Sequence, residues 1–231
     1  MHNGTVDARL HPAPDPPPSW GDAPRVDAYL ERVDRLAPRL AGEEAFASLL
    51  PEGPISLLDL GCGDGRLAAT ALRARPTLRR VVAADCSAPM LDRARSRFAD
   101  DTRVSVREWD LNRSIGPLGR FDLITSGFAI HHLEDGRKRS LLAEVAAQLH
   151  PDGLFANLEV VASPTPELHA EFLALIGRPE DDPEDRLVEV STQLDWMRAA
   201  GLVQVDCMWK WRGFALLVGR APVGAPTGPR S

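Results

Sequence analysis

The feature that most constrains the fold is a glycine-rich turn that joins an apolar run to a helical pattern. Residues 55–60 form the apolar run, which is typical of a buried strand. Gly61, Gly63 and Gly65 follow at every second position, and apolar residues recur at helical spacing over 66–75. This order predicts the opening of a nucleotide-type βαβ unit, because a Cβ in the turn would hold a ligand away from the backbone N–H groups.

The acids around this turn narrow the kind of ligand that it suits. Asp59 stands two residues before the first glycine, and Asp64 lies inside the turn. Dinucleotide folds prefer the spacing G-x-G-x-x-G, and a P-loop requires Gly-Lys-Ser/Thr, which this turn lacks. An acid-flanked turn therefore favours a ligand with a cationic end and no phosphate. S-Adenosylmethionine, which carries an ammonium and a sulfonium, is such a ligand.

The segment Asp-Leu-Gly-Cys-Gly-Asp-Gly at 59–65 resembles the first motif of the class I S-adenosylmethionine-dependent methyltransferases. The resemblance implies that Asp59, Gly61, Cys62 and Gly63 bind the cofactor S-adenosylmethionine. A glycine turn without a ligand is the alternative.

Alternating strand and helix patterns predict an α/β fold with helices on both faces of a sheet. The resemblance covers residues 25–219 and implies a Rossmann-like, three-layer α/β/α sandwich. Its seven-stranded, mostly parallel sheet is expected to end in an antiparallel C-terminal hairpin at 202–208 and 214–218. A Pro-rich arm at 1–24 and a Gly/Pro-rich tail at 220–231 are predicted to be disordered.

A second apolar strand, 81–85, ends in an acid. Asp85 at the tip of this strand is placed to accept hydrogen bonds from both hydroxyls of a ribose. The alternative is a helix cap, because Ser-Ala-Pro follows at 87–89. With the ribose role, Cys86 and Met90 would lie near the adenine, although Met90 fits a core position equally well.

A third strand, 104–109, is followed by Asp110 and Leu111. The family resemblance implies that Asp110 meets the adenine amino group and that Leu111 supplies an apolar backbone contact beside it. The alternative is an acidic turn at the end of a strand.

The segment 121–133 resembles the fourth-strand motif of the family, with the strand ending near Ser126. Its carboxyl end belongs beside the glycine turn, where open α/β sheets bind ligands. Gly127 is expected to contact the methionine part of the cofactor. His131 is a candidate for binding the methyl acceptor, and the alternative for both histidines here is packing at a helix start.

His132 and Glu159 are the candidate catalytic bases. Imidazole titrates near neutral pH, and Glu159 interrupts an apolar strand predicted at 154–161, where a carboxylate needs a partner or a function. Because His131 and His132 are adjacent, we expect their side chains to point apart, and no metal site is predicted.

Elements outside the central strands are predicted to close the site. Residues 25–50 form a helical pattern, expected to break near Pro38, that lids the cofactor or simply packs on the sheet. Tyr29 on this segment is expected to contact the cofactor, since similar methyltransferases place a tyrosine there.

The C-terminal part supplies the other candidates for the acceptor site. Residues 164–200 are predicted as a helical insertion before the last strands. Trp209 and Trp211 at the hairpin either form a wall of the acceptor pocket or pack on the sheet.

Composition limits the partners. The chain has 231 residues and a net charge of −6, so nucleic acid is not an expected partner. Its three cysteines are scattered, and no apolar run reaches the length of a membrane span. We expect a cytoplasmic protein without a membrane partner, either a monomer or a homodimer.

The resemblance, which is nearest to small-molecule methyltransferases, implies methyl transfer to an O or N atom of a small molecule, with secondary metabolites as one class. A carboxy-S-adenosylmethionine-synthase-like enzyme is an alternative, although Trp196 stands where that group has arginine. A non-catalytic cofactor-binding protein is another. An NAD-dependent oxidoreductase is disfavoured, because Tyr29 is the sole tyrosine and leaves no Tyr-x-x-x-Lys pair.

Overall fold

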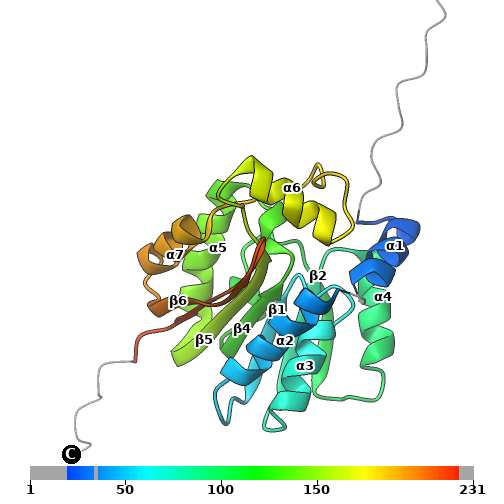
Figure 1. Cartoon of the computed structure of the whole chain (residues 1–231). Coiled ribbons are helices and arrows are strands. Elements are labelled where there is room, and N and C mark those ends of the chain that lie inside the picture. Colours follow the sequence, from blue (N-terminus) through cyan, green and yellow to red (C-terminus); the bar gives the residue numbers. More distant parts are fainter. Residues whose placement is uncertain (1–19, 34–35, 224–231) are drawn as a thin grey trace, which may run out of the picture.

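The fold is built on one seven-stranded sheet with the order β3-β2-β1-β4-β5-β7-β6 (Figure 1). The computed structural model describes residues 20–33 and 36–223. The strands are β1 (Ser56–Leu60), β2 (Arg80–Asp85), β3 (Val104–Glu108), β4 (Phe121–Gly127), β5 (Leu149–Val160), β6 (Val203–Trp211) and β7 (Phe214–Arg220). The first five are parallel, and β7 pairs antiparallel with both β5 and β6.

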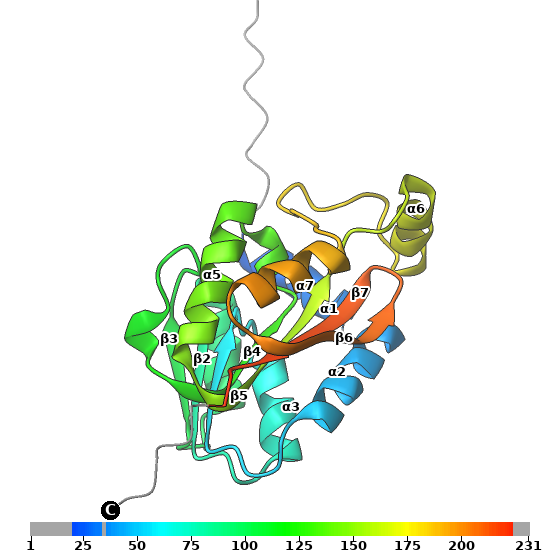
Figure 2. The same ribbon diagram turned by 90° about the vertical axis from the view of Figure 1, so that its left-hand side faces the viewer.

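Helices cover both faces of this sheet (Figure 2). They are α1 (Ala23–Val33), α2 (Ala37–Leu49), α3 (Arg66–Ala74), α4 (Ala88–Arg97), α5 (Asp135–Gln148), α6 (Pro166–Leu175) and α7 (Val190–Ala199). Helices α2, α3 and α4 pack on one face, and α5 and α7 pack on the other. The predicted three-layer α/β/α class with an antiparallel C-terminal hairpin is confirmed.

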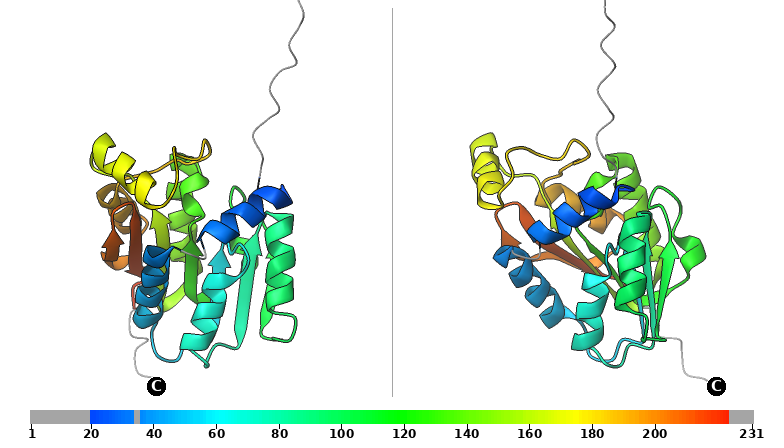
Figure 3. Two further views of the ribbon diagram at one scale, coloured as in Figure 1. Left: turned by 45° about the vertical axis from the view of Figure 1, so that its right-hand side comes forward. Right: turned by 90° about the vertical axis from the view of Figure 1, so that its right-hand side faces the viewer.

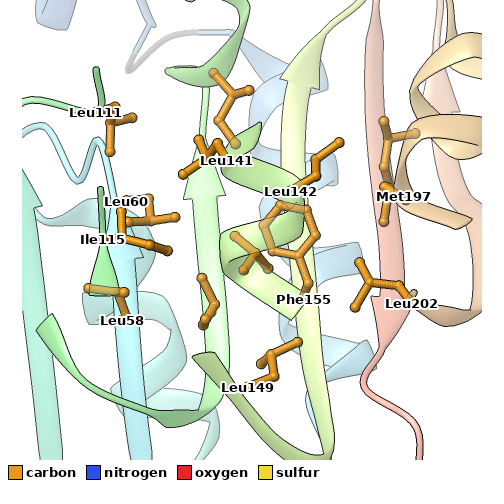
Figure 4. Packing of buried hydrophobic residues seen from close by; sticks show 14 of the residues in the cluster. Leu58, Leu60, Leu111, Ile115, Leu141, Leu142, Leu149, Phe155, Met197 and Leu202 are labelled. Carbon is orange, nitrogen blue, oxygen red and sulfur yellow. The ribbon is translucent and has the colours of Figure 1, made fainter. Parts of the chain in front are cut away.

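The core divides in two because side chains alternate along each strand. Leu58 of β1 joins Phe155, Leu141 and Met197 in the cluster under α5 and α7 (Figure 4). Leu57, the next residue along β1, faces the opposite cluster under α2 and α3. Every residue of β1 is buried, which agrees with its continuous apolar run.

The boundary between α5 and β5 differs from the prediction. Helix α5 ends at Gln148, and β5 begins at Leu149 rather than near 154. Leu149 pairs with Phe121, and the register then shifts before the next pair. A bulge absorbs the Pro-Asp-Gly segment that reads as a helix stop. Asp152 takes a positive φ of 61°, and a Cβ on Gly153 would lie 2.8 Å from the carbonyl oxygen of His150.

The segment 25–50 is two helices, since α1 ends at Val33 and Pro38 lies in the first turn of α2. The break near Pro38 is therefore confirmed. Helix α1 lies over the carboxyl ends of the central strands (Figure 3). Of the predicted arm, residues 1–19 lie outside the described residues, as do 224–231 of the predicted tail, whereas β7 extends to Arg220.

The segment 164–200 consists of α6, α7 and the connection 176–189 between them. The hairpin turn is Arg212-Gly213, so Trp209 and Trp211 lie on β6 itself rather than in the turn. Within the described ranges, no helix combines the length and apolar character needed to cross a membrane.

Candidate functional site

A cavity of about 210 Å³ lies at the carboxyl ends of β1, β2 and β4. This is the edge at which open α/β sheets bind ligands. Every residue predicted to bind the cofactor lines it: Tyr29, Asp59, Gly61, Cys62, Gly63, Asp85, Cys86, Met90, Asp110, Leu111 and Gly127. We call it the first cavity.

The glycine turn forms the floor of the first cavity and needs its glycines for two reasons. Gly61 has a φ of 62°, and a Cβ there would lie 2.2 Å from the Cβ of Ala129. Gly63 has a φ of 54°, but a Cβ there would meet only Met90 Sδ, at 3.7 Å. Gly61 is therefore required by the packing of the fold itself, whereas Gly63 leaves its space to the cavity.

Asp85 stands beside this turn as predicted. Its two carboxylate oxygens accept hydrogen bonds from the backbone N–H groups of Gly63 and Ser87, each at 2.8 Å. The cap of α4 is Ser87, whose hydroxyl accepts from the N–H of Met90. The Asp85 carboxylate also lines the first cavity. Burial raises the pKa of Asp85.

Asp59 is fully buried beneath the turn. It accepts hydrogen bonds from the hydroxyl of Thr125 and the N–H of Ala68, both at 3.1 Å, and so ties β1 to β4 and α3. Burial raises its pKa to about 7, and the nearby charges of Asp85 and Asp64 add to this effect. Asp59 therefore stabilises the fold around the turn and also lines the first cavity.

The opposite wall of the first cavity comes from α1 and α2. Arg39 donates to the hydroxyl of Tyr29 at 3.0 Å and pairs with Glu43 at 3.1 Å, and Glu43 also pairs with Arg66. Sequence analysis missed Trp20, Arg39 and Glu43. The i, i+4 charge pair on α2 was the available signal for two of them.

A second cavity, of about 70 Å³, adjoins the first. The two share a wall that consists of Trp20, Tyr29, Arg39, Phe128 and His132. The second cavity is further lined by His131 and by Arg178 and Asp185 from the α6–α7 connection.

His131 is held between two carboxylates. Its Nδ1 lies 2.5 Å from Oε1 of Glu159, and its Nε2 lies 3.4 Å from Oδ1 of Asp185. Burial opposes a charge on His131, but the two carboxylates outweigh burial and raise its pKa to about 9. Burial likewise opposes the charge on Asp185, whose pKa His131 nevertheless lowers to about 2.

His132 behaves in the opposite way. Burial and the charge on His131 lower its pKa to about 4, so its imidazole is neutral at pH 7. The expectation that the two adjacent side chains point apart is wrong. Their ring centroids lie 4.0 Å apart, because both residues belong to the tight 3-10 turn η2 (Ile130–His132).

Three of the predicted acceptor-side residues lie outside both cavities. Glu159 is 1% exposed and stands behind His131, so it positions that ring rather than meeting a ligand. Trp209 packs over Gly42, and Trp211 meets Phe172 edge to face, with ring centroids 6.3 Å apart. Both tryptophans thus contact neighbouring side chains outside the two cavities.

Comparison with known proteins agrees with this geometry. Residues 57–153 match the family described as "Methyltransferase domain". This stretch holds β1 to β4 and all the strand ends that meet at the first cavity. Over residues 57–153 the chain is therefore similar to methyltransferases.

Relatives and solved structures support this domain. An uncharacterized methyltransferase of Mycobacterium tuberculosis is 37% identical over 121 residues, which are 52% of this chain and 57% of that relative. The chain thus spans a little over half the length of the relative. An O-methyltransferase family protein from Burkholderia thailandensis aligns with a TM-score of 0.69 and 22% identity, over 88% of this chain and 61% of that one.

A third solved structure shares the fold of this chain. Human N-acetylserotonin methyltransferase, solved in complex with SAM, aligns with a TM-score of 0.64 and 16% identity. The alignment covers 87% of this chain and 56% of the human one. At this identity the likeness shows the fold alone, and it is the same α/β fold.

Proposed function

We propose that this protein is an S-adenosylmethionine-dependent methyltransferase that methylates an O or N atom of a small molecule. The observation that carries the proposal is the pair of adjoining cavities. The first takes the cofactor, and the second, smaller one takes the end of the acceptor that is methylated.

The donor groups of the first cavity fit S-adenosylmethionine. Asp59, Asp64 and Asp85 surround the glycine turn with carboxylates, which would repel a pyrophosphate and suit a cationic amino acid. Asp85 lines the cavity beside the turn, which supports its role at the ribose, and Gly63 leaves room for a close approach to the backbone. Asp110 and Leu111 line the same cavity, which supports the adenine role that the resemblance implies.

The small acceptor follows from the size and enclosure of the second cavity. It lies beneath α1 and the α6–α7 connection, and about 70 Å³ admits a ring or a short chain rather than a folded macromolecule. The net charge of −6 gives no support for a nucleic-acid substrate. We infer a soluble small molecule as the acceptor.

When bound, S-adenosylmethionine supplies an electrophilic methyl group on a sulfonium. The chain orients the two reactants and excludes water, which provides most of the catalysis in such displacements. His132 lies in the wall shared by both cavities and is neutral above about pH 4, so it is placed to take a proton from the acceptor. His131, paired with Glu159 and Asp185, lines the second cavity beside it.

Calorimetry tests the cofactor assignment. We expect micromolar binding of S-adenosylmethionine or its demethylated product and no binding of NAD at the same concentrations. Binding of NAD in preference to S-adenosylmethionine would contradict the proposal.

Transfer is tested with isotopically labelled methyl donor and a panel of small phenols, amines and carboxylic acids. Once an acceptor is known, His132→Ala should lower kcat at least about tenfold while the affinity for S-adenosylmethionine changes little. An unchanged kcat would remove His132 from the mechanism.

A further inference from the structure

We propose that His131, His132 and Asp185 form a binding site for one divalent transition-metal ion at the second cavity. One donor atom from each residue lies within 4.8 Å of the other two. The nitrogens that face Asp185 are Nε2 of His131 and Nδ1 of His132. Oδ1 of Asp185 stands 3.4 Å from the first nitrogen and 3.5 Å from the second. Ligands bound to one zinc ion at about 2.1 Å are separated by about 3.4 Å in a tetrahedron.

The far side of His131 is arranged as in known metal sites. Its Nδ1 faces the buried Glu159, which also accepts the N–H of Val160 at 2.8 Å. A ligand histidine almost always gives its second ring nitrogen to a carboxylate or carbonyl in this manner, which aims the other nitrogen at the metal. Nε2 of His131 is thereby directed at Asp185 and His132.

Hydrogen bonds also fix the orientation of the Asp185 carboxylate. Its Oδ2 accepts from Arg178 at 3.3 Å and from the backbone N–H of Asp182 at 3.2 Å. These two donors fix the carboxylate and leave Oδ1 for the histidine nitrogens. Oδ2 of Asp185 thus pairs with Arg178, which also lines the second cavity.

His132 supplies an independent observation. Its Nδ1 is buried and has no hydrogen-bond partner among the described residues. A buried polar nitrogen without a partner is costly, and a bound ion would satisfy it. A bound ion would displace the proton from Nε2 of His131 and take over the positive charge that the protonated ring places between Glu159 and Asp185.

The donor set indicates the class of metal. Two imidazole nitrogens and one carboxylate suit zinc or ferrous iron, whereas magnesium and calcium prefer oxygen ligands. Three protein ligands leave a coordination position open toward the cavity.

The open coordination position also indicates which class of acceptor would bind. This extension rests on the proposed function. An acceptor hydroxyl bound there loses its proton to solvent more readily, because the ion lowers the pKa of a coordinated oxygen. His132 is then a ligand rather than a base. The acceptor is expected to be a compound with an ionisable hydroxyl that can coordinate a metal.

The test is a titration of tag-free, chelator-treated protein with zinc chloride by calorimetry, without methyl donor or acceptor. We expect one ion per chain. His132→Ala, Asp185→Asn and Glu159→Gln should each weaken binding at least about tenfold. Cobalt chloride should give the visible absorption of a site with nitrogen ligands in the wild-type protein, which decides the matter if a variant fails to fold.

Two control variants each remove a possible zinc ligand that lies outside the proposed site. His169 pairs with Asp181 at 2.8 Å on an exposed surface but lacks a second histidine, and Cys86 is an exposed thiol. His169→Ala and Cys86→Ser should leave the zinc affinity unchanged. Absence of stoichiometric zinc binding, or equal binding by His132→Ala and Asp185→Asn, would overturn the site. If S-adenosylmethionine binds and zinc does not, the metal site alone is overturned.

Discussion

The two cavities are built in different ways. The first is lined by residues that follow the central strands within a few positions, such as Gly61 after β1 and Asp85 at the end of β2. The second depends on Asp185, which reaches His131 from a connection between α6 and α7. Local sequence therefore specifies the first cavity, whereas long-range packing specifies the second. Substitutions should separate the two.

The largest effect is expected at the turn itself. Gly61→Val places side-chain atoms against Ala129 and strains a positive φ, so it should lower the free energy of unfolding by more than about 3 kcal/mol. Urea denaturation measures this loss. Gly63→Ala is the control, since its Cβ meets only Met90 Sδ: it should cost only about 1–2 kcal/mol, the strain of its φ. Equal losses of unfolding free energy would contradict the distinction between Gly61, which the fold requires, and Gly63, which leaves space for a ligand.

A pH-dependent effect is expected at Asp59. The folded state raises its pKa from 3.8 to about 7, so it binds a proton more tightly than the unfolded chain. Its contribution to stability is present below about pH 4 and is lost as the pH rises through about 7, by on the order of 4 kcal/mol. Asp59→Asn should remove this loss.

The measurement for Asp59 is the difference in unfolding free energy between variant and wild type from pH 4 to 8. The difference should shift in favour of the variant as the pH rises. A difference that stays constant over this range would mean that Asp59 is charged in the folded protein.

A smaller effect is expected on the affinity for the cofactor. Asp85→Asn keeps the shape of the side chain but removes a charged acceptor from the ribose position. It should weaken binding of S-adenosylmethionine by about 1–3 kcal/mol, measured by calorimetry. Asp92→Asn, at an exposed acid of α4 that lines neither cavity, serves as the control. Unchanged affinity would mean that Asp85 stabilises the backbone at Gly63 and Ser87 but does not bind the ribose.

The smallest effect is expected at the hairpin. Trp211→Ala should leave the affinity for S-adenosylmethionine within about threefold, under about 0.7 kcal/mol, because the residue lines neither cavity. It should instead lower the melting temperature through lost contact with Phe172 and Phe214. Loss of acceptor turnover at an unchanged melting temperature would return Trp211 to the acceptor wall.

The success of the sequence-based prediction differs between the two cavities in the same way. The glycine turn, Asp85 and Asp110 each follow a strand directly, so the parallel sheet brings them to one edge. Arg39 and Trp20 join the cavity only through the placement of α1 and α2, which no local pattern specifies. The convergence of His131, His132 and Asp185 depends on a single tight turn and a distant connection, and adjacency alone suggested the opposite.

The wall that both cavities share has a thermodynamic consequence. Trp20 and Tyr29 stand at 5.1 Å, ring edge to face, between the two compartments, and Trp20 also lies 5.6 Å from His132. A ligand that fixes the positions of these two rings in one cavity therefore also changes the shape of the other cavity. By linkage, the factor by which the methyl donor changes the affinity for the acceptor must equal the factor by which the acceptor changes the affinity for the donor. The affinities for the donor and the acceptor are therefore expected to be coupled through this shared aromatic wall.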